Sequence, residues 1–512
     1  MTGPTASPYD GVDYPGQSYP FTHPAHLATV GALYGMEPAP VASCRVLELG
    51  CGHGMNLLPM AYRQPDASFV GIDLSGRSIE VAANAAAACG VRNVEFRHGN
   101  IMEIDAQWGR FDYIIAHGVY SWVPAEVREK ILTIVKENLS PHGVAYVSYN
   151  AYPGSHLRNL TRDMMLFHTR YISDPQERVR QARVALLMAT EGSDASKVYG
   201  SLLRDRSERV ERMPDQLLLH DDLLEIATPF LLHEMVADAE RHGLQYLSDA
   251  NLWRRDLRHY PEDVRRILLG LPETEFVARD QYQDFIDGHG FRNTLLCHAE
   301  VPLNRSVRPD HMGRFFFSCS AAPVSEDVDP ASSDTLEFKG EEGAVLASDR
   351  ALVKAALLEL QDAWPGSLGF DELLERAVKR SGVPVDGASQ LAEHRKDLGG
   401  VLFQAVFTGH VGIHKEPPKL ATRVSRKPEA SVVARRQAET GFMITNLRHR
   451  LIKLEDDKVR RFLGLLDGTR DIDDLTADFA AGAPPDAPPD DLTRETIERN
   501  LGHLANLALL VA

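Results

Sequence analysis

Short apolar runs alternate with stretches of helical periodicity between about residues 45 and 154. Runs bounded by turn-forming residues predict strands, whereas apolar residues at every third or fourth position predict helices. The predicted strands are Arg45–Leu49, Ser68–Ile72, Val94–His98, Phe111–Ala116 and Val144–Tyr149, and the predicted helices are Asn56–Arg63, Gly76–Cys89 and Ala125–Leu139. This alternation is typical of an α/β domain with a mostly parallel, Rossmann-like sheet.

The pattern becomes mainly helical after about residue 155. Leu157–Thr169, Pro175–Met188 and Phe230–His242 place apolar residues at helical intervals, which predicts a helical middle region. The acidic segment 323–340, which contains Ser and Pro, is typical of a linker. Further helices are predicted at Arg350–Trp364, Gly369–Lys379 and Lys458–Leu466, and Gly400–His410 is predicted to be a strand or another buried element.

Several domains are expected, because 512 residues exceed what a single core organises. The segment Ser18–Pro24 has too many prolines to lie inside a helix, which indicates an arm or lid outside the core. A winged-helix-like fold is one candidate for the α+β C-terminal domains. The predicted order is an arm at 1–40, a Rossmann-like domain at 41–155, a helical region at 156–322, a linker at 323–340, an α+β domain at 341–430 and a C-terminal domain at 431–512.

The composition narrows the classes of function. A formal net charge of -17 argues against the broad basic surface that nucleic-acid binding requires. The chain starts without the features of a secretory signal and contains no apolar stretch near the roughly 18 residues of a membrane-spanning helix, so a cytoplasmic protein without membrane insertion is expected. Five cysteines without a C-x-x-C pair favour a reducing compartment and no zinc site.

The strongest chemical signal is the sequence that follows the first predicted strand, Val46-Leu47-Glu48-Leu49-Gly50-Cys51-Gly52-His53-Gly54. Glycines let the backbone turn sharply and approach a ligand beside the free N–H groups of the next helix. A dinucleotide fingerprint reads G-x-G-x-x-G, whereas here the third glycine comes one residue early and an acid precedes the first. An acid repels a pyrophosphate but tolerates the ammonium and sulfonium of S-adenosylmethionine. We therefore predict this cofactor, held by Glu48, Gly50, Cys51, Gly52 and Asn56.

Polar residues also follow the next three predicted strands. An acid at the end of the second strand stands where ribose hydroxyls are bound, and a polar and an apolar residue after the third can meet adenine. The corresponding candidates for cofactor contacts are Asp73, Leu74, Asn100, Ile101, His117 and Gly118. Ligands of open α/β sheets bind at the carboxyl ends of strands, so the set predicts a class I methyltransferase domain. Taken singly, the glycines are also compatible with a plain tight turn and Asp73 with a helix cap.

The whole chain resembles the bacterial methyltransferases with a regulatory domain, which include the rickettsial lysine methyltransferases that act on outer membrane proteins. Short stretches spread over most of the sequence carry this resemblance. They are Ser18–Pro24, Ala116–Pro124, Ser148–Gly154, His220–Leu223, His242–Leu247, Gln281–Phe285, Phe291–Leu296, Thr445–His449 and Leu466–Arg470.

The resemblance implies methyl transfer from S-adenosylmethionine to a protein or peptide, with lysine as the leading acceptor. It also implies a helical middle region that often mediates dimerisation, and a C-terminal part that helps to hold a large acceptor. One departure is Asn100, where many class I methyltransferases have Asp. This difference leaves the exact contact with adenine undetermined, but it does not affect the prediction of the cofactor pocket.

A lysine acceptor must be neutral before it attacks the methyl group, and deprotonation from a pKa near 10.4 costs about 4.6 kcal/mol at pH 7. Aromatic walls and oxygen acceptors can guide the ammonium into place. Candidates for this catalytic, substrate-side role are Tyr19, His23, Tyr120, Trp122, Tyr149, Asn150 and Tyr152. His23 and His117 are candidate bases, and a buried structural histidine is the alternative for each.

The sequence His220-Asp221-Asp222 suggests a metal site, but no third and fourth ligands follow at a recognisable spacing. A helix N-cap by one of the aspartates is expected instead, and no metal is predicted.

Three other functions stay open at this point. A carboxylate or hydroxyl of a peptide natural product is an alternative acceptor, because a carboxylate needs no base at pH 7. A module that binds S-adenosylmethionine and a partner protein without catalysis is a second alternative. A nicotinamide oxidoreductase is disfavoured by the glycine spacing.

Overall fold

The computed structural model describes residues 16–325, 328–340, 345–481 and 493–511, so part of the predicted arm lies outside the described residues. The chain divides into two compact units. The first unit comprises Met1–Gln17, Pro38–Ala250 and Glu262–Pro302, and the second comprises Ser18–Glu37, Asn251–Pro261 and Leu303–Ala512.

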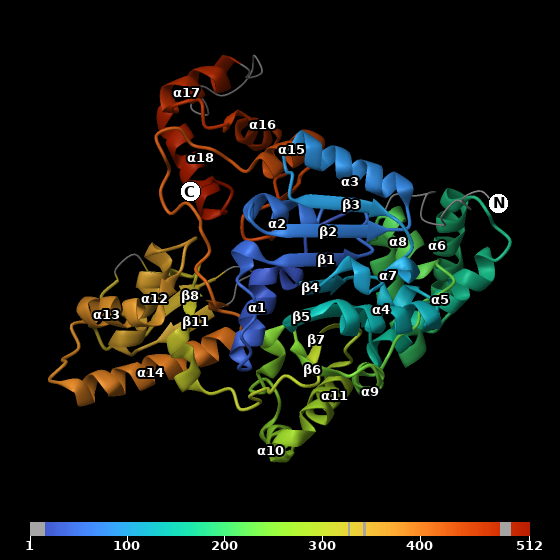
Figure 1. The fold of residues 1–512 in the computed structure, drawn as a ribbon, viewed down its shortest axis with the longest axis horizontal. Coiled ribbons are helices and arrows are strands. Elements are labelled where there is room, and N and C mark those ends of the chain that lie inside the picture. Colours follow the sequence, from blue (N-terminus) through green and yellow to red (C-terminus); the bar gives the residue numbers. More distant parts are fainter. Residues whose placement is uncertain (1–15, 326–327, 341–344, 482–492, 512) are drawn as a thin grey trace. The chain divides into compact units, whose positions relative to one another are not determined.

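A seven-stranded sheet forms the centre of the first unit, with the strand order β3-β2-β1-β4-β5-β7-β6 (Figure 1). The strands are β1 Arg45–Leu49, β2 Ser68–Asp73, β3 Val94–His98, β4 Phe111–Ala116, β5 Leu139–Asn150, β6 Leu244–Asp249 and β7 Phe291–His298. Strands β1 to β5 pair in parallel, whereas β7 pairs antiparallel with both β5 and β6. The predicted Rossmann-like sheet is confirmed, and β5 is longer than expected because it begins where the preceding helix ends.

Helices connect β1 to β2, β2 to β3 and β4 to β5, as is usual in α/β domains. Fully buried side chains such as Leu47, Ile114 and Val147 fill the space between the sheet and these helices. The connecting helices are α2 Leu57–Arg63, α3 Gly76–Ala88 and α4 Ala125–Asn138, close to their predicted bounds.

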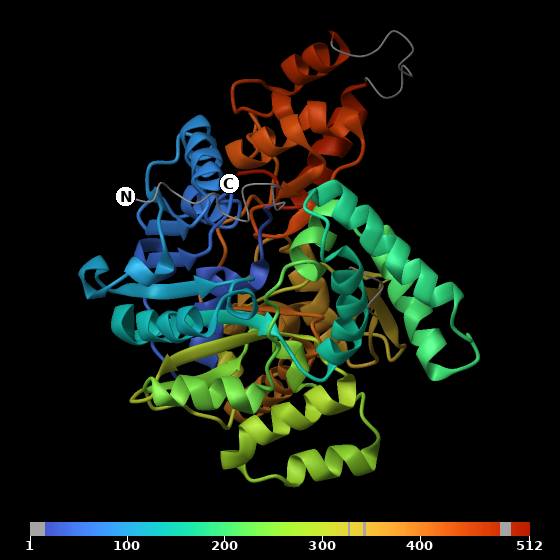
Figure 2. The same ribbon diagram turned by 90° about the vertical axis from the view of Figure 1, so that its right-hand side faces the viewer.

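Four helices that follow β5 pack against one another around Met165, Leu186 and Leu218, and Figure 2 shows them side by side in green. They are α5 Gly154–Thr169, α6 Pro175–Glu191, α7 Val198–Arg212 and α8 Asp215–Asp222. Three more helices of the first unit are α9 Leu232–Arg241, α10 Glu262–Gly270 and α11 Phe276–Asp287. The prediction of a helical middle region is confirmed for these segments.

The same region also contains two strands that were not predicted. β6 and β7 extend the sheet of the first unit, so region 156–322 is not purely helical. Most residues of both strands are buried, and in β7 the polar side chains of Arg292 and Thr294 are buried as well. Because these polar residues interrupt the apolar run by which a buried strand is recognised, the sequence of β7 does not have the pattern of a strand.

The described residues of the second unit form three small sheets and several helices. Its strands are β8 Phe316–Ser318, β9 Ala322–Pro323, β10 Leu336–Lys339, β11 Val345–Ser348, β12 Leu368–Gly369, β13 Gly412–His414, β14 Met443–Thr445 and β15 Leu451–Lys453. Its helices are α1 Pro24–Leu33, α12 Ala351–Asp362, α13 Phe370–Ser381, α14 Ala388–Phe407, α15 Val432–Thr440, α16 Asp457–Leu465, α17 Ile472–Ala481 and α18 Arg494–Asn506. The predicted helices at 350–364, 369–379 and 458–466 are confirmed.

The prediction that the N-terminal arm lies outside the core is wrong for α1. This helix belongs to the second unit, and Leu27, Val30 and Leu33 are fully buried. Pro24 occupies the first helical position, where a missing N–H group is tolerated, and the Nδ1 atom of His23 accepts a hydrogen bond from the N–H of Ala25 at 3.1 Å. The prolines therefore start a helix instead of preventing one.

Of two further predictions for the second unit, the linker is wrong, whereas Gly400–His410 is a buried element as expected but not a strand. The expected linker 323–340 contains β10, whose Leu336 and Phe338 are buried while Glu337 is exposed, so strand alternation outweighs the acidic composition. Gly400–His410 is mainly the end of α14, because Leu402, Ala405 and Val406 repeat at helical intervals and form its buried side.

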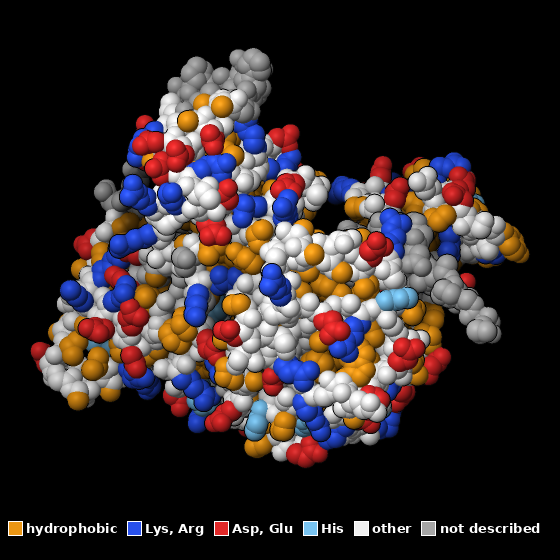
Figure 3. All heavy atoms as spheres, turned by 45° about the horizontal axis from the view of Figure 1, so that its top comes forward, with side chains coloured by type: hydrophobic (Ala, Val, Ile, Leu, Met, Phe, Trp, Pro, Cys, Tyr) orange, Lys and Arg blue, Asp and Glu red, His pale blue; other side chains and the backbone are white. Residues whose placement is uncertain are grey.

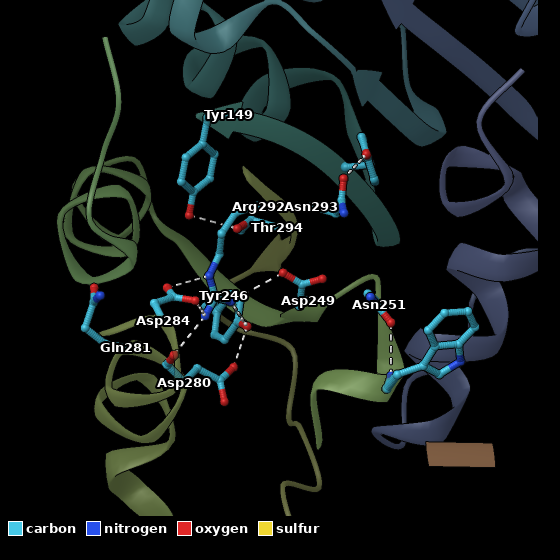
Figure 4. Close-up of polar contacts among 12 residues, drawn as sticks. Tyr149, Tyr246, Asp249, Asn251, Asp280, Gln281, Asp284, Arg292, Asn293 and Thr294 are labelled. Carbon is cyan, nitrogen blue, oxygen red and sulfur yellow. Dashed lines mark hydrogen bonds and ion pairs between the residues drawn. The ribbon is translucent and has the colours of Figure 1, made fainter. Parts of the chain in front are cut away.

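Arg292 of β7 forms the most deeply buried ion pairs of the first unit among the described residues (Figure 4). Its Nε and Nη2 atoms donate to the two carboxylate oxygens of Asp284 at 2.9 Å, and its Nη1 atom lies 3.4 Å from Asp249. The hydroxyl of Tyr246 donates to Asp280 at 2.7 Å beside them. This network fixes α11 against β6 and β7.

We expect Arg292→Met to lower the free energy of unfolding by about 3–5 kcal/mol, because it removes the buried cation that offsets the charge of two buried carboxylates. Arg97→Met is the matched control, since the pair of Arg97 with Glu95 is exposed and contributes about 0–1 kcal/mol. Urea unfolding followed by circular dichroism measures both variants. Equal shifts of the midpoint would show that the network does not stabilise the unit.

Candidate active site

The glycine loop between β1 and α2 is held in a conformation that suits glycine. Gly50, Gly52 and Gly54 have φ angles of 73°, 50° and 70°, in the left-handed region that side chains rarely adopt. The N–H groups of Gly50 and Cys51 donate to the carbonyl oxygen of Ile72 at 2.8 and 3.1 Å, which ties the loop to the end of β2.

The three glycines differ in what a side chain would meet. A Cβ atom on Gly50 would lie 2.6 Å from Val119, and one on Gly54 would lie 2.5 Å from Phe96. A Cβ atom on Gly52 would meet no described atom within 4 Å. Gly50 and Gly54 are therefore required for packing, whereas Gly52 borders open space at the carboxyl edge of the sheet.

Asp73 braces this loop from the end of β2. Its Oδ2 atom accepts a hydrogen bond from the N–H of Gly52 at 2.8 Å, and its Oδ1 atom accepts one from the N–H of Ser75 at 2.9 Å. The side chain of Ser75 in turn caps α3 by accepting from Ser78 at 3.2 Å. Each carboxylate oxygen keeps a second lone pair. Leu74 beside it is 48% exposed, which suits an apolar contact with a ligand.

Glu48 is buried behind the loop, and Asn56 at the start of α2 donates to its Oε1 atom at 2.7 Å. Its Oε2 atom is buried without a hydrogen-bond partner among the described residues. Burial raises the pKa of this carboxyl group to about 8; the hydrogen bond from Asn56 opposes the rise and the nearby charge of Asp73 adds to it. A cation placed next to Oε2 would stabilise the carboxylate.

The ends of β3 and β4 complete this edge. Asn100 is exposed, and its Oδ1 atom accepts from the N–H of Met102 at 3.0 Å, while Ile101 packs against the core. Gly118 donates its N–H to the Oγ atom of Ser148 at 2.9 Å. Burial lowers the pKa of His117 to about 4, so this imidazole is neutral at pH 7.

The predicted cofactor residues thus follow β1, β2, β3 and β4 at one edge of one sheet. Hydrogen bonds join the β1 and β2 members directly, whereas those after β3 and β4 are placed by the sheet register.

The substrate-side candidates of the first unit do not all lie on loops. Tyr120 and Tyr149 are buried, and both rings pack against Phe230 at centroid distances of 5.4 and 6.1 Å. Burial raises the pKa of both hydroxyls, and Tyr149 is hydrogen-bonded to Thr294 at 3.0 Å. Tyr149 and Asn150 belong to β5, and Tyr120 begins a short 3-10 helix.

The other candidates are also tied to the protein. The N–H of Asn150 donates to the Oγ atom of Ser121 at 2.8 Å. The guanidinium of Arg158 lies 5.5 Å from the ring centroid of Trp122. Tyr152 stacks on His156 at 4.1 Å.

Tyr19 and His23 belong to the second unit, and their part in the site stays a prediction. Within that unit the arm meets the motif Thr445–His449, since Ser18 is hydrogen-bonded to Thr445 at 3.2 Å and the rings of His23 and His449 lie 5.1 Å apart. The Nδ1 atom of His23 is an acceptor in the cap of α1.

Sequence reasoning missed the residues that hold the β4 loop in place. Tyr146 and Ser148 of β5 and Asn293 of β7 contact His117, Gly118 or each other, and only the quoted stretches Ser148–Gly154 and Phe291–Leu296 hinted at two of them. Contacts between strands distant in sequence leave no local signal.

The predicted N-cap at His220-Asp221-Asp222 is wrong, because these residues form the last turn of α8. Asp222 is buried and pairs with Arg158 at 2.8 Å and Arg206 at 3.4 Å. Within the described residues, no group of three His, Cys, Asp or Glu side chains is arranged to hold a metal ion.

The edge fits S-adenosylmethionine. The unpartnered oxygen of Glu48 suits its ammonium group, the spare lone pairs of Asp73 suit ribose hydroxyls, and the open space at Gly52 leaves room for the ligand backbone. Asn100 and Ile101 offer a polar and an apolar contact for adenine.

We expect Gly52→Ala to weaken binding of S-adenosylhomocysteine (AdoHcy) at least about tenfold, or 1.4 kcal/mol, because the added methyl group enters the space for the cofactor. Gly90→Ala is the control: its φ of 67° gives a similar strain of about 1–2 kcal/mol, and its Cβ atom also meets nothing within 4 Å. Calorimetric titration measures both. Similar losses of affinity in the two variants would mean that backbone strain, and not contact, limits binding.

The titration of Glu48 gives a second prediction. An unfolded chain ionises this group near 4.5 and the folded protein near 8, so the folded state loses stability as the pH rises through that interval. A cationic ligand favours the carboxylate, so uptake of AdoHcy at pH 7 should release about one proton from the wild type and none from Glu48→Gln. Calorimetry in buffers of different ionisation enthalpy counts the protons. Equal release from both proteins would place the titrating group elsewhere.

Three family models match the chain. The model described as "Methyltransferase domain" matches residues 40–192, "Predicted methyltransferase regulatory domain" matches 214–298, and "PKMT, C-terminal winged helix domain" matches 426–485. The last match confirms a winged helix in the C-terminal part.

Relatives match over nearly the full length. The uncharacterized protein RP789 of Rickettsia prowazekii is 34% identical over 455 residues, which are 86% of this chain and 80% of that protein. The structure of PKMT2 from Rickettsia typhi has a TM-score of 0.87 at 29% identity and covers 98% of this chain and 100% of that one, and its complex with AdoHcy gives the same values. The chain therefore belongs to the bacterial class I S-adenosylmethionine-dependent methyltransferases that carry a regulatory domain, and it is similar to the rickettsial PKMT proteins.

Proposed function

We propose that this methyltransferase acts on a protein or peptide and transfers the methyl group to the side-chain amine of lysine. The supporting observation is that the likeness to PKMT2 extends over 98% of the chain, through the regulatory and winged-helix parts and not only through the cofactor domain. Regions far larger than the cofactor pocket are typical of enzymes that hold a macromolecular acceptor.

The cofactor, when bound, supplies a methyl group on a positively charged sulfur, which an amine attacks in line. The protein mainly has to hold the two reactants at contact distance and exclude water. Glu48, Asp73 and the loop at Gly52 perform the first task for the cofactor. Asp73 holds the loop through the N–H of Gly52, and Asn56 holds Glu48.

The acceptor amine must be neutral when it attacks. His117 is neutral at pH 7, because burial keeps its pKa near 4, and it follows β4 at the same edge as the cofactor residues. A neutral imidazole can accept a hydrogen bond from an amine N–H, which orients the nitrogen lone pair. A group with so low a pKa does not hold the released proton, so the proton passes to solvent.

Charge supports a protein acceptor over RNA. The formal net charge of the chain is -17, and on the face shown in Figure 3 the Lys and Arg side chains are intermixed with Asp and Glu. Phosphate binding requires basic side chains gathered on one surface.

Within the described ranges, every helix is too short or too polar to cross a lipid bilayer.

The proposal is tested with purified enzyme, cofactor labelled in the methyl group, and lysate of unmethylated proteins. Label should enter protein, survive mild alkali and be recovered as methylated lysine after acid hydrolysis. The Gly52→Ala variant is the control for background labelling. Label that alkali releases would indicate a carboxyl ester instead, and label confined to small compounds would contradict a protein acceptor.

The pH dependence separates the two acceptors. With saturating cofactor, the rate of lysine methylation should rise about tenfold per pH unit between pH 6 and 8, because the neutral fraction of an amine with a pKa near 10.4 does so. A carboxylate is fully ionised over this range and would give a flat profile. Initial rates on the labelled acceptor decide between them.

A further inference from the structure

Four arginines gather where helices α5, α6, α7 and α8 pack together (Figure 2). Arg158 and Arg162 belong to α5, Arg178 to α6 and Arg206 to α7, and we call this set the arginine cluster. Arg158 and Arg206 both pair with the fully buried carboxylate of Asp222 in α8, at 2.8 and 3.4 Å. In a chain with 72 acidic and 55 basic residues, such a local excess of positive charge is opposite to the overall composition.

The other two arginines have no carboxylate within ion-pair distance among the described residues. Arg162 is 7% exposed and donates to the carbonyl oxygens of Leu224 and Glu225, and its Nε atom is buried without a hydrogen-bond partner. The side chain of Arg178 has neither a hydrogen bond nor an ion pair with a described residue, and its Nε atom is buried as well. Burial lowers the pKa of Arg162, and the charges of Arg158 and Arg178 lower it further.

The charge balance of the cluster favours an anionic ligand. Two nearby acids, Asp163 and Asp221, act on the arginines at longer range, but neither forms an ion pair with a described residue. The Oδ2 atom of Asp222 is also buried without a hydrogen-bond partner among the described residues, yet a cation there would add a fifth positive charge to the four present. A buried cation without a counter-ion is costly, and an added carboxylate offsets that cost.

The arginine cluster borders the segment 117–124, which links β4 to α4 and contains cofactor and substrate candidates. The guanidinium of Arg158 lies 5.5 Å from the ring centroid of Trp122, and the N–H of Thr228 donates to the carbonyl oxygen of Ser121 at 2.8 Å. In Figure 1, helices α5 to α8 lie on the side toward which the arrows of β1 to β4 point. The side chain of Arg158 is 25% exposed, so a ligand can reach the cluster from solvent beside the cofactor edge.

We propose that the arginine cluster binds an acidic side chain of the acceptor polypeptide, so that the enzyme prefers lysines that lie near an aspartate or a glutamate. This inference rests on the proposed function, since it takes the acceptor to be a polypeptide. Guanidinium groups suit a carboxylate because two of their N–H groups can donate to its two oxygens at once. Arg162 and Arg178 supply donors that no described carboxylate uses.

The first test compares two fluorescent peptides that contain one central lysine, flanked by glutamates in one peptide and by glutamines in the other. Fluorescence anisotropy measures their binding to the full chain saturated with AdoHcy. The wild type should bind the glutamate peptide at least about tenfold more tightly, because charge-assisted hydrogen bonds form only with the carboxylates. This comparison needs no variant of the enzyme.

The second test uses Arg178→Met, with Arg180→Met as the matched control. Arg180 lies on the same helix and pairs with Glu177 at the surface, so both changes remove one positive charge from α6. Arg178→Met should weaken binding of the glutamate peptide at least about fivefold and leave binding of the glutamine peptide unchanged. Its unfolding midpoint should not fall, because the Arg178 side chain has no polar partner among the described residues. Arg180→Met should bind both peptides like the wild type.

The kinetics of methylation give an independent measurement. With the acceptor found by labelling, Arg178→Met should raise the KM for that acceptor and leave the affinity for AdoHcy unchanged. Replacing the acids next to the methylated lysine by amides should raise the KM for the wild type by a similar factor, and by much less for Arg178→Met.

Equal binding of the two peptides to the wild type would overturn the proposal, and so would a preference that survives Arg178→Met or is lost equally in Arg180→Met. A short RNA or inorganic phosphate that binds more tightly than the glutamate peptide, and depends on Arg178, would assign the cluster to a phosphate ligand instead. Methylated lysine without a preference for glutamate would refute the role of the cluster and leave the proposed function standing. Label in esters, with a glutamate preference that depends on Arg178, would refute the lysine acceptor and leave the recognition of acidic side chains standing.

Discussion

The carboxylate of Asp73 is the point on which the cofactor edge depends. A loop in which three of five residues are glycines in left-handed conformations has few side chains to fix it, so hydrogen bonds from neighbouring residues help to hold its shape. Asp73 does this with one oxygen while its other oxygen holds the residue that caps α3. One side chain thus sets the positions of the loop after β1 and of the helix after β2 together, and Glu48 is confined behind them.

A structural feature could be predicted from the sequence only where the residues that determine it are close together in the chain. The first four strands and the glycine loop were predicted from local signals, which are short apolar runs, the spacing of the glycines and an acid about twenty residues later. The structure confirms the strands and brings Gly52 and Asp73 within hydrogen-bond distance. Asn100 and His117 are correctly placed at strand ends because the parallel register fixes which ends share an edge.

The rest depends on partners far away in the sequence. Tyr149 ends a predicted strand and was a candidate for contact with the substrate, but its hydroxyl is hydrogen-bonded to Thr294, and nothing local indicates that β7 lies beside β5. In the same way, the prolines around His23 indicate an interrupted arm, although the helix that they start is buried in the second unit. Neither outcome contradicts the local rules, which do not specify what an element packs against.

The position of β7 has a consequence for how this enzyme is divided into parts. The general methyltransferase match ends at residue 192, yet the backbone of β5 from Ala145 to Asn150 forms its ladder with β7, about 145 residues later. A fragment cut after the helices α5 and α6 would expose that row of N–H and C=O groups as an open edge, the kind of surface on which chains aggregate. A fragment that ends at residue 192 therefore lacks the two strands, β7 and β6, that complete the sheet of the first unit.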